Sequence, residues 1–238
     1  MVRRRRVSKK RFYGKKQELV LPVRSPFFEF MRKNLFYLIA GSVLILFLII
    51  GLSIWKYVAN KKEEKASLLF YQAYKVYQKA IKEEKTMEDS LKLFQTLVQD
   101  YSGTNEEVLS WFYLGNCQFA LKKFDDAIIS YNNFLEKISP QTQLALLAYD
   151  SLGYCYEEKG DFKKAIENFE KTIDPSPGLG EIGYLNLARC YEALGDKENS
   201  LKIYKKFLFE YPNSQKIEFV REKIRVLELK SKGKVSKP

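Results

Sequence analysis

The residue types that most often carry enzyme chemistry are sparse in this chain of 238 residues. It contains no histidine, which removes the commonest general base and metal ligand. Carboxylates occur in pairs such as Asp125/Asp126 and Glu157/Glu158, but charged residues of this kind normally lie on solvated helix surfaces. No nucleophile–base constellation, glycine-rich phosphate loop or metal-ligand spacing accompanies them. We therefore expect a non-enzymatic protein that uses no cofactor, metal ion or small-molecule ligand.

The three cysteines, Cys117, Cys155 and Cys190, are too far apart for a CxxC or zinc motif. Each comes two residues after a glycine or alanine that recurs at equivalent points of three similar segments. Equivalent points on stacked helical hairpins lie roughly 10 Å apart, which exceeds the reach of a disulfide bond, about 7 Å. The spacing predicts three small, buried packing residues rather than a redox or metal centre.

The elements that would position any binding site are helical repeats. From residue 63 onward, apolar residues recur at three- and four-residue spacing, and three segments superimpose with periods of 38 and 35 residues. They begin at Trp111, Tyr149 and Tyr184. Each has an aromatic residue, a leucine, a small residue, and then a second small residue and a second aromatic residue. The last four positions are held by Leu114, Leu152 and Leu187; Gly115, Gly153 and Ala188; Ala127, Ala165 and Ser200; and Tyr131, Phe169 and Tyr204.

This pattern resembles the tetratricopeptide repeat. The resemblance implies stacked helical hairpins, in which the small residues let two helices approach and the aromatic residues fill the space before the next hairpin. Gly160 and Gly195 stand where a left-handed residue would end the first helix of a hairpin. The first repeat departs from the pattern, with Lys122 where glycine is usual and Gln118 where tyrosine is usual, but neither change is expected to alter the fold.

An uncharged apolar stretch precedes the repeats. It runs from Leu35 to Trp55, and a helix of this length is roughly 30 Å long, like the hydrocarbon layer of a bilayer. Aromatic residues flank it on both sides, as expected where a chain meets lipid headgroups. Because the stretch is longer than a signal-peptide core, the sequence predicts a retained signal anchor.

The basic residues are concentrated before this helix. Residues 1–34 carry a net charge of +10, whereas the remaining residues carry +2. The basic flank of a transmembrane helix stays in the cytoplasm, so we expect the N-terminus inside and the repeats on the far side. The tail would also attract anionic lipid. Contact of the tail with ribosomal or other RNA phosphates is the alternative.

The sequence thus predicts an all-α protein: a single N-terminal transmembrane helix followed by a tetratricopeptide-repeat α-solenoid. Upstream of the three repeats, Ser90, Phe94 and Leu97 match the second helix of a degenerate repeat whose first helix is rich in tyrosine. The predicted divisions are a basic disordered cytoplasmic tail (1–34), a transmembrane helix (35–57), membrane-proximal helices with a degenerate first repeat (58–107), three repeats (108–214), a capping helix (215–230) and a disordered tail (231–238).

By the geometry of that family, the first helices would line a concave groove that binds protein. The residues expected there are Leu109, Phe112, Asn116, Phe119, Asp150, Tyr154, Glu157, Ile182, Leu185, Arg189 and Glu192. This groove is aromatic and mildly acidic, which suits an apolar or basic extended segment or helix. The alternative is that these residues only pack the repeats together.

Some members of the family clamp a C-terminal carboxylate with lysine, asparagine and arginine. Only Asn116 matches that set here, while Phe112, Ser151, Ile182 and Asn186 stand at other clamp positions. We therefore do not expect a carboxylate clamp.

The order of basic tail, single anchor and three to four repeats resembles the bacterial ancillary subunit of the Sec translocon. That resemblance implies a single-pass inner-membrane protein whose periplasmic repeat domain links the translocon to periplasmic chaperones. The EYPNS stretch, Glu210 to Ser214, also resembles periplasmic repeat proteins of outer-membrane assembly and cell division, so an envelope scaffold is the alternative. A further alternative is a ribosome- or RNA-contacting anchor that acts through the basic tail, although nucleic acid is not the expected partner.

Overall fold

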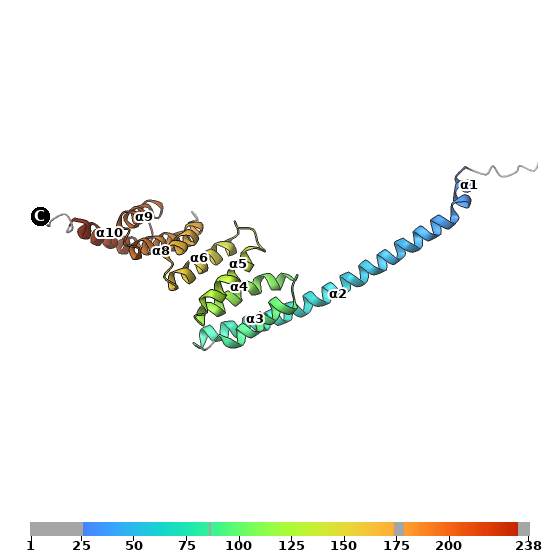
Figure 1. The fold of residues 1–238 in the computed structure, drawn as a ribbon, viewed down its shortest axis with the longest axis horizontal. Helices are drawn as coiled ribbons and strands as arrows, with labels where there is room; N and C mark the ends of the chain where they lie inside the picture. Colours follow the sequence, from blue (N-terminus) through green and yellow to red (C-terminus); the bar gives the residue numbers. More distant parts are fainter. Residues whose placement is uncertain (1–25, 86, 174–178, 233–238) are drawn as a thin grey trace, which may run out of the picture. The chain divides into compact units, whose positions relative to one another are not determined.

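The computed structural model describes residues 26–85, 87–173 and 179–232, and every regular element in these ranges is a helix (Figure 1). The chain divides into two compact units, residues 1–56 and 57–238. The predicted architecture, an apolar N-terminal helix followed by a solenoid of helical hairpins, is confirmed. The helices are α1 (Pro26–Lys33), α2 (Leu35–Lys82), α3 (Glu88–Asp100), α4 (Asn105–Ala120), α5 (Phe124–Leu135), α6 (Gln143–Glu158), α7 (Phe162–Phe169), η1 (Glu170–Thr172), α8 (Leu179–Ala193), α9 (Lys197–Glu210) and α10 (Ile217–Lys232).

Helix α1 falls within the segment 1–34 for which the sequence predicts disorder. Pro26 takes its first position, where the missing N–H group costs no hydrogen bond. Glu29 lies in the first turn and Arg32 and Lys33 in the last, an order that suits the helix dipole. The rest of the predicted tail, residues 1–25, lies outside the described residues, as do residues 233–238 of the predicted C-terminal tail.

Helix α2 is 48 residues long and begins with the apolar stretch. It is the one helix in the described ranges that is long and apolar enough to cross a membrane, and none of that stretch is buried within the protein. Its large side chains are exposed, Phe47 by 68% and Trp55 by 71%. A soluble core does not cover these residues.

The same helix continues past residue 57 into the second unit without a break. There Ala66, Ala73 and Ala80 are buried at seven-residue spacing, which places them on one helix face. The face packs in a cluster with Phe94 and Leu97 of α3 and with residues of α4. The second part of α2 therefore serves as the first helix of a hairpin whose second helix is α3.

The remaining hairpins stack in chain order. Each of the helices α3 to α10 contacts the next, and α6 also touches α4 and α8, so the first helices of successive hairpins are neighbours. A Cβ atom added at Gly115 would lie 2.6 Å from the Tyr131 ring, and one at Gly153 would lie 2.4 Å from the Phe169 ring. Only glycine allows these rings to approach so closely, as the repeat pattern predicts.

The turns inside the hairpins use one backbone conformation. Gly160 and Gly195 have φ values of 76° and 75°, in the left-handed region expected of them. Lys122 occupies the same position in the first repeat with φ 59°. The fold therefore keeps the turn even where a side chain makes that conformation unfavourable by about 1–2 kcal/mol.

All three cysteines are fully buried and free. Burial raises the pKa of each thiol to about 12, so the thiolate form is suppressed at neutral pH. The prediction that they are packing residues is confirmed.

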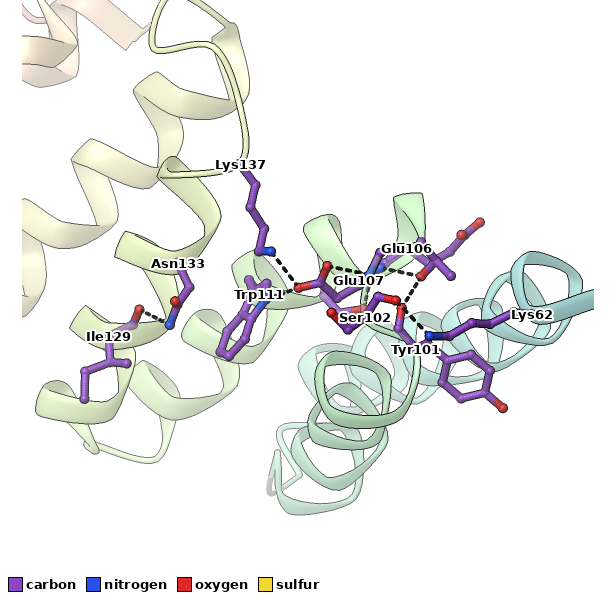
Figure 2. Close-up of polar contacts among 12 residues, drawn as sticks. Lys62, Tyr101, Ser102, Glu106, Glu107, Trp111, Ile129, Asn133 and Lys137 are labelled. Carbon is purple, nitrogen blue, oxygen red and sulfur yellow. Dashed lines mark hydrogen bonds and ion pairs between the residues drawn. The ribbon is translucent and has the colours of Figure 1, made fainter. Parts of the chain in front are cut away.

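A polar network joins the first two hairpins (Figure 2). The buried Glu107 carboxylate accepts a 2.6 Å hydrogen bond from the Trp111 indole and pairs with Lys137 at 3.2 Å. Nearby, the Lys62 ammonium donates to the Ser102 carbonyl at 2.8 Å, which ties α2 to the turn before α4. These groups satisfy one another, so we interpret the network as a structural connection.

Candidate functional site

The residues predicted to line the groove lie mainly on α4, α6 and α8, and the structure brings eight of the eleven into the walls of two adjoining pockets. Tyr154 lines both pockets. Glu157 and Glu192 line neither pocket but form ion pairs with cations that line the second one, Arg189 and Lys223. Leu109 is half-buried on α4 and lines neither pocket. The other seven are Phe112, Asn116, Phe119, Asp150, Ile182, Leu185 and Arg189.

The first pocket, called here the aromatic pocket, has a volume of about 450 Å³. It is formed by α2, α4, α5 and α6, together with the residue that precedes α3. Five aromatic rings and one carboxylate define it: Tyr77, Phe112, Phe119, Tyr131, Tyr154 and Asp150.

Packing and hydrogen bonds hold these rings in place. The Tyr131 hydroxyl donates to the Asn116 side-chain oxygen at 2.7 Å, and its ring lies 5.9 Å from that of Phe112. Tyr154 makes an edge contact with Phe169, with 5.3 Å between the ring centres. The pocket walls are therefore largely pre-formed, which lowers the entropy lost when a ligand binds.

Asp150 has one described hydrogen-bond donor. The Asn186 amide, from α8, donates to its carboxylate at 3.1 Å and also to the Tyr154 hydroxyl at 3.0 Å. Burial raises the pKa of the Asp150 carboxyl to about 6, although the Asn186 hydrogen bond and the positive charge of Arg189 each lower it. A polar environment with a bound cation would reverse that shift.

The second pocket, called here the lysine pocket, has a volume of about 370 Å³. It is formed by α6, α8, α9 and α10 together with the residue that precedes α10. Three cations and three apolar or aromatic side chains define it: Arg189, Lys216, Lys223, Tyr154, Ile182 and Phe219.

Two of these cations have acidic partners. Arg189 donates two hydrogen bonds of 2.6 Å to the Glu157 carboxylate, and this hydrogen bonding raises the pKa of the guanidinium. Lys223 lies 3.3 Å from the Glu192 carboxylate, which also accepts a 2.6 Å hydrogen bond from Tyr204. The charges of this pocket are therefore largely compensated from within the protein.

The sequence predicts one mildly acidic groove, but the structure divides it into pockets of opposite character. The reason is α10, which was predicted only as a cap. Its residues Phe219 and Lys223, with the preceding Lys216, form one wall of the lysine pocket. Sequence reasoning also missed Tyr77 of α2 in the aromatic pocket. The tyrosine-rich composition of that segment was the available signal, but repeat spacing does not give its register.

The pockets offer aromatic faces, one carboxylate and compensated cations. Within the described residues, no three His, Cys, Asp or Glu side chains gather in a way that would hold a metal ion. Aromatic faces and isolated charged groups are suited to non-covalent recognition of a polypeptide segment.

Known proteins share this fold. A profile described as "Tetratricopeptide repeat-like domain" matches residues 29–149, and two "Tetratricopeptide repeat" profiles match residues 146–175 and 183–214. No curated protein matches the chain.

Three of the similar solved structures, each with a TM-score above 0.5, illustrate this likeness. A crystal structure of MamA protein has 23% identity and a TM-score of 0.51, covering 65% of this chain and 79% of that one. The MamA RS-1 ArsTM double mutant has 12% identity and a TM-score of 0.55, covering 69% and 85%. Nearly identical TPR-like repeats of a Podosopora anserina putative kinesin light chain have 12% identity and a TM-score of 0.51, covering 68% and 95%. At these identities the likeness concerns the fold alone.

Proposed function

The chain belongs to the tetratricopeptide repeat-like domain family, and from that premise we propose that its repeat unit holds a segment of another polypeptide in the aromatic and lysine pockets. The observation that carries this proposal is the position of Tyr154 in both linings. One continuous segment can therefore occupy both pockets. Their aromatic walls suit the apolar side chains of an extended strand or an amphipathic helix.

Site-specific photocrosslinking in native membranes tests this function. A photoreactive residue at Phe119, in the aromatic pocket, is expected to crosslink to polypeptides, and Tyr154→Ala is expected to reduce the yield. The matched control is the same photoreactive residue at Phe209, which is 82% exposed and lines neither pocket. Equal yields at the two positions, or no effect of Tyr154→Ala, would contradict the proposal.

We further propose that residues 35–57 anchor the protein in a bacterial inner membrane, with the basic tail in the cytoplasm and the repeat unit in the periplasm. The exposed apolar side chains of α2 support an anchor, and the +10 charge of residues 1–34 supports this orientation. Protease added to spheroplasts should digest the repeat unit, whereas protease added to inverted vesicles should not. The reverse result would show that the orientation is wrong.

Most specifically, we propose that the protein is an ancillary adaptor that links the protein-export translocon to periplasmic chaperones. Its support is the order of basic tail, single anchor and repeats, and the family match itself begins at residue 29, before the apolar helix. Crosslinkers placed at Leu38 or Ile50 should trap translocon subunits. Crosslinks to lipid alone would contradict this role, and recovery of outer-membrane assembly or division proteins would favour an envelope scaffold instead.

A further inference from the structure

Asp150 is the one acidic residue in the lining of the aromatic pocket. Its carboxylate accepts a neutral hydrogen bond from Asn186, and no described lysine or arginine forms an ion pair with it. Arg189, whose charge lowers the pKa of Asp150, is held by both oxygens of Glu157 and lies over the Tyr154 ring, 5.7 Å from its centre. The Asp150 side chain is partly exposed, but burial still disfavours its charged form, so a cation supplied by a ligand would stabilise that form.

The surroundings of Asp150 are those of a cation-binding pocket. Tyr154 lies one helical turn further along α6, on the same face, and Tyr77 and Tyr131 contribute rings from α2 and α5. Aromatic faces attract ammonium and guanidinium groups, and a carboxylate adds a charge-assisted hydrogen bond. A single carboxylate is too few for a metal ion, whereas it matches one lysine or arginine side chain.

We propose that the aromatic pocket selects a lysine or arginine side chain of the bound segment, with Asp150 as its acceptor and the tyrosine rings as its walls. This inference rests on the proposed function, because it names the side chain that the peptide groove recognises. The occupant of the pocket is thus a basic residue flanked by apolar ones.

The proposal makes binding depend on pH through one group. The titratable groups that line the pocket with Asp150 are Tyr77 from α2, Tyr131 from α5 and Tyr154 from α6. Arg189 from α8 lines the other pocket, and its positive charge lowers the pKa of Asp150. Burial raises the pKa of each of these tyrosines, so they stay neutral, and the guanidinium stays charged. Asp150 alone among them gains its charge as the pH rises through about 6.

The test uses the full-length chain in nanodiscs of zwitterionic lipid and a phage-displayed library of random peptides. Selection on the wild-type protein should enrich lysine or arginine at a fixed position among apolar residues. Selection on Asp150→Asn should lose that enrichment. Glu158→Gln removes one negative charge from the exposed end of the same helix, outside the pocket, and should behave as wild type.

Two synthetic peptides that differ only in the ammonium group then measure the contribution of that group to binding. The best lysine peptide should bind the wild-type protein at least about tenfold more tightly than its norleucine analogue, and this ratio should approach one for Asp150→Asn. Binding of the lysine peptide to wild type should be about tenfold weaker at about pH 5 than at about pH 7.5, because only about a tenth of Asp150 is ionised at the lower pH.

The outcomes separate the two levels of the proposal. Peptides selected without a basic residue, or equal affinity of the lysine and norleucine peptides for wild type, would overturn the role of Asp150 and leave the groove intact. Failure to select any peptide on wild type would overturn the proposed function and this inference together.

Discussion

The aromatic pocket and the lysine pocket adjoin at Tyr154 and differ in how their acidic groups are neutralised. In the lysine pocket, the Glu157 carboxylate takes two 2.6 Å hydrogen bonds from Arg189, and Glu192 is held by Lys223 and Tyr204. In the aromatic pocket, Asp150 accepts its one described hydrogen bond from the Asn186 amide and feels the charge of Arg189 without a described ion pair. The first arrangement closes the charges within the stack of repeats, whereas the second leaves Asp150 without a described ion pair, which is the basis of the proposed recognition of a basic side chain.

This contrast teaches how to separate binding residues from packing residues in one groove. A closed ion pair lowers the free energy of the folded chain by itself, although only slightly where it is exposed. The Asp150 carboxylate is only partly exposed and desolvation disfavours its charged form, so removing the charge should stabilise the protein and, under our proposal, should weaken binding. The four predictions that follow test this difference, beginning with the largest effect.

Phe169→Ala should damage both pockets together. The fully buried Phe169 ring supports Tyr154, which the pockets share, so its loss leaves a cavity behind their common wall. We expect the free energy of unfolding to fall by about 3–5 kcal/mol, measured by denaturation of the full-length chain in detergent. Phe209→Ala, at an 82% exposed position, should change it by less than about 0.5 kcal/mol. Equal losses for the two variants would refute the role of Phe169.

Asp150→Asn should stabilise the protein at about pH 7.5. The pKa of Asp150 is about 6 in the folded chain, above the ordinary value near 4, so the folded state binds more protons between these values. Stability from this group is therefore present at low pH and is lost as the pH rises through about 6. The variant should gain about 2–3 kcal/mol at about pH 7.5 and almost nothing near pH 4. A gain of equal size at both pH values would show that the charge is not its cause.

Glu157→Gln should destabilise the protein at about pH 7.5, the opposite of the effect expected for Asp150→Asn. It removes the carboxylate that holds Arg189 and leaves the guanidinium with a weaker, neutral acceptor. Because the Arg189 side chain is 46% exposed, the loss in unfolding free energy should be only about 1 kcal/mol, read from the same denaturation curves. Stabilisation by this variant would remove the distinction between the two pockets.

Lys223→Met should have the smallest effect. Glu192 keeps the hydrogen bond from Tyr204, and the ion pair that it loses is partly exposed and 3.3 Å long. We expect the free energy of unfolding to fall by less than about 1 kcal/mol. The decrease should be smaller still at high ionic strength, where exposed ion pairs are screened. Thermal unfolding at low and high salt measures it, and a loss that is independent of salt would point to packing by the lysine stem instead.

The repeat fold was predictable because local sterics determine it. Position 153 must hold a small residue to admit the Phe169 ring, and position 160 adopts a left-handed conformation that favours glycine. Both requirements are therefore visible in the sequence as glycines at repeat spacing. The continuity of α2 past residue 57 was also open to inference, because no glycine or proline interrupts the chain from there to Lys82.

The polarity of the two pockets was not predictable in the same way. The contact between Asn186 and Asp150 joins residues 36 positions apart and depends on how α6 and α8 are offset along their axes. The position of Lys223 in the second pocket depends on the angle at which α10 packs on α9, and repeat spacing carries no information about that helix. Which carboxylates form ion pairs therefore becomes clear only from the side-chain positions in the folded stack.

Tyr154 gives the groove a shared partition. Because Phe169 and Asn186 hold this ring in place, its position fixes where one subsite ends and the other begins. The order in which a bound chain presents its basic and apolar residues should then matter as much as their number. Reversing the sequence of a bound peptide should therefore weaken its binding even when its composition is unchanged.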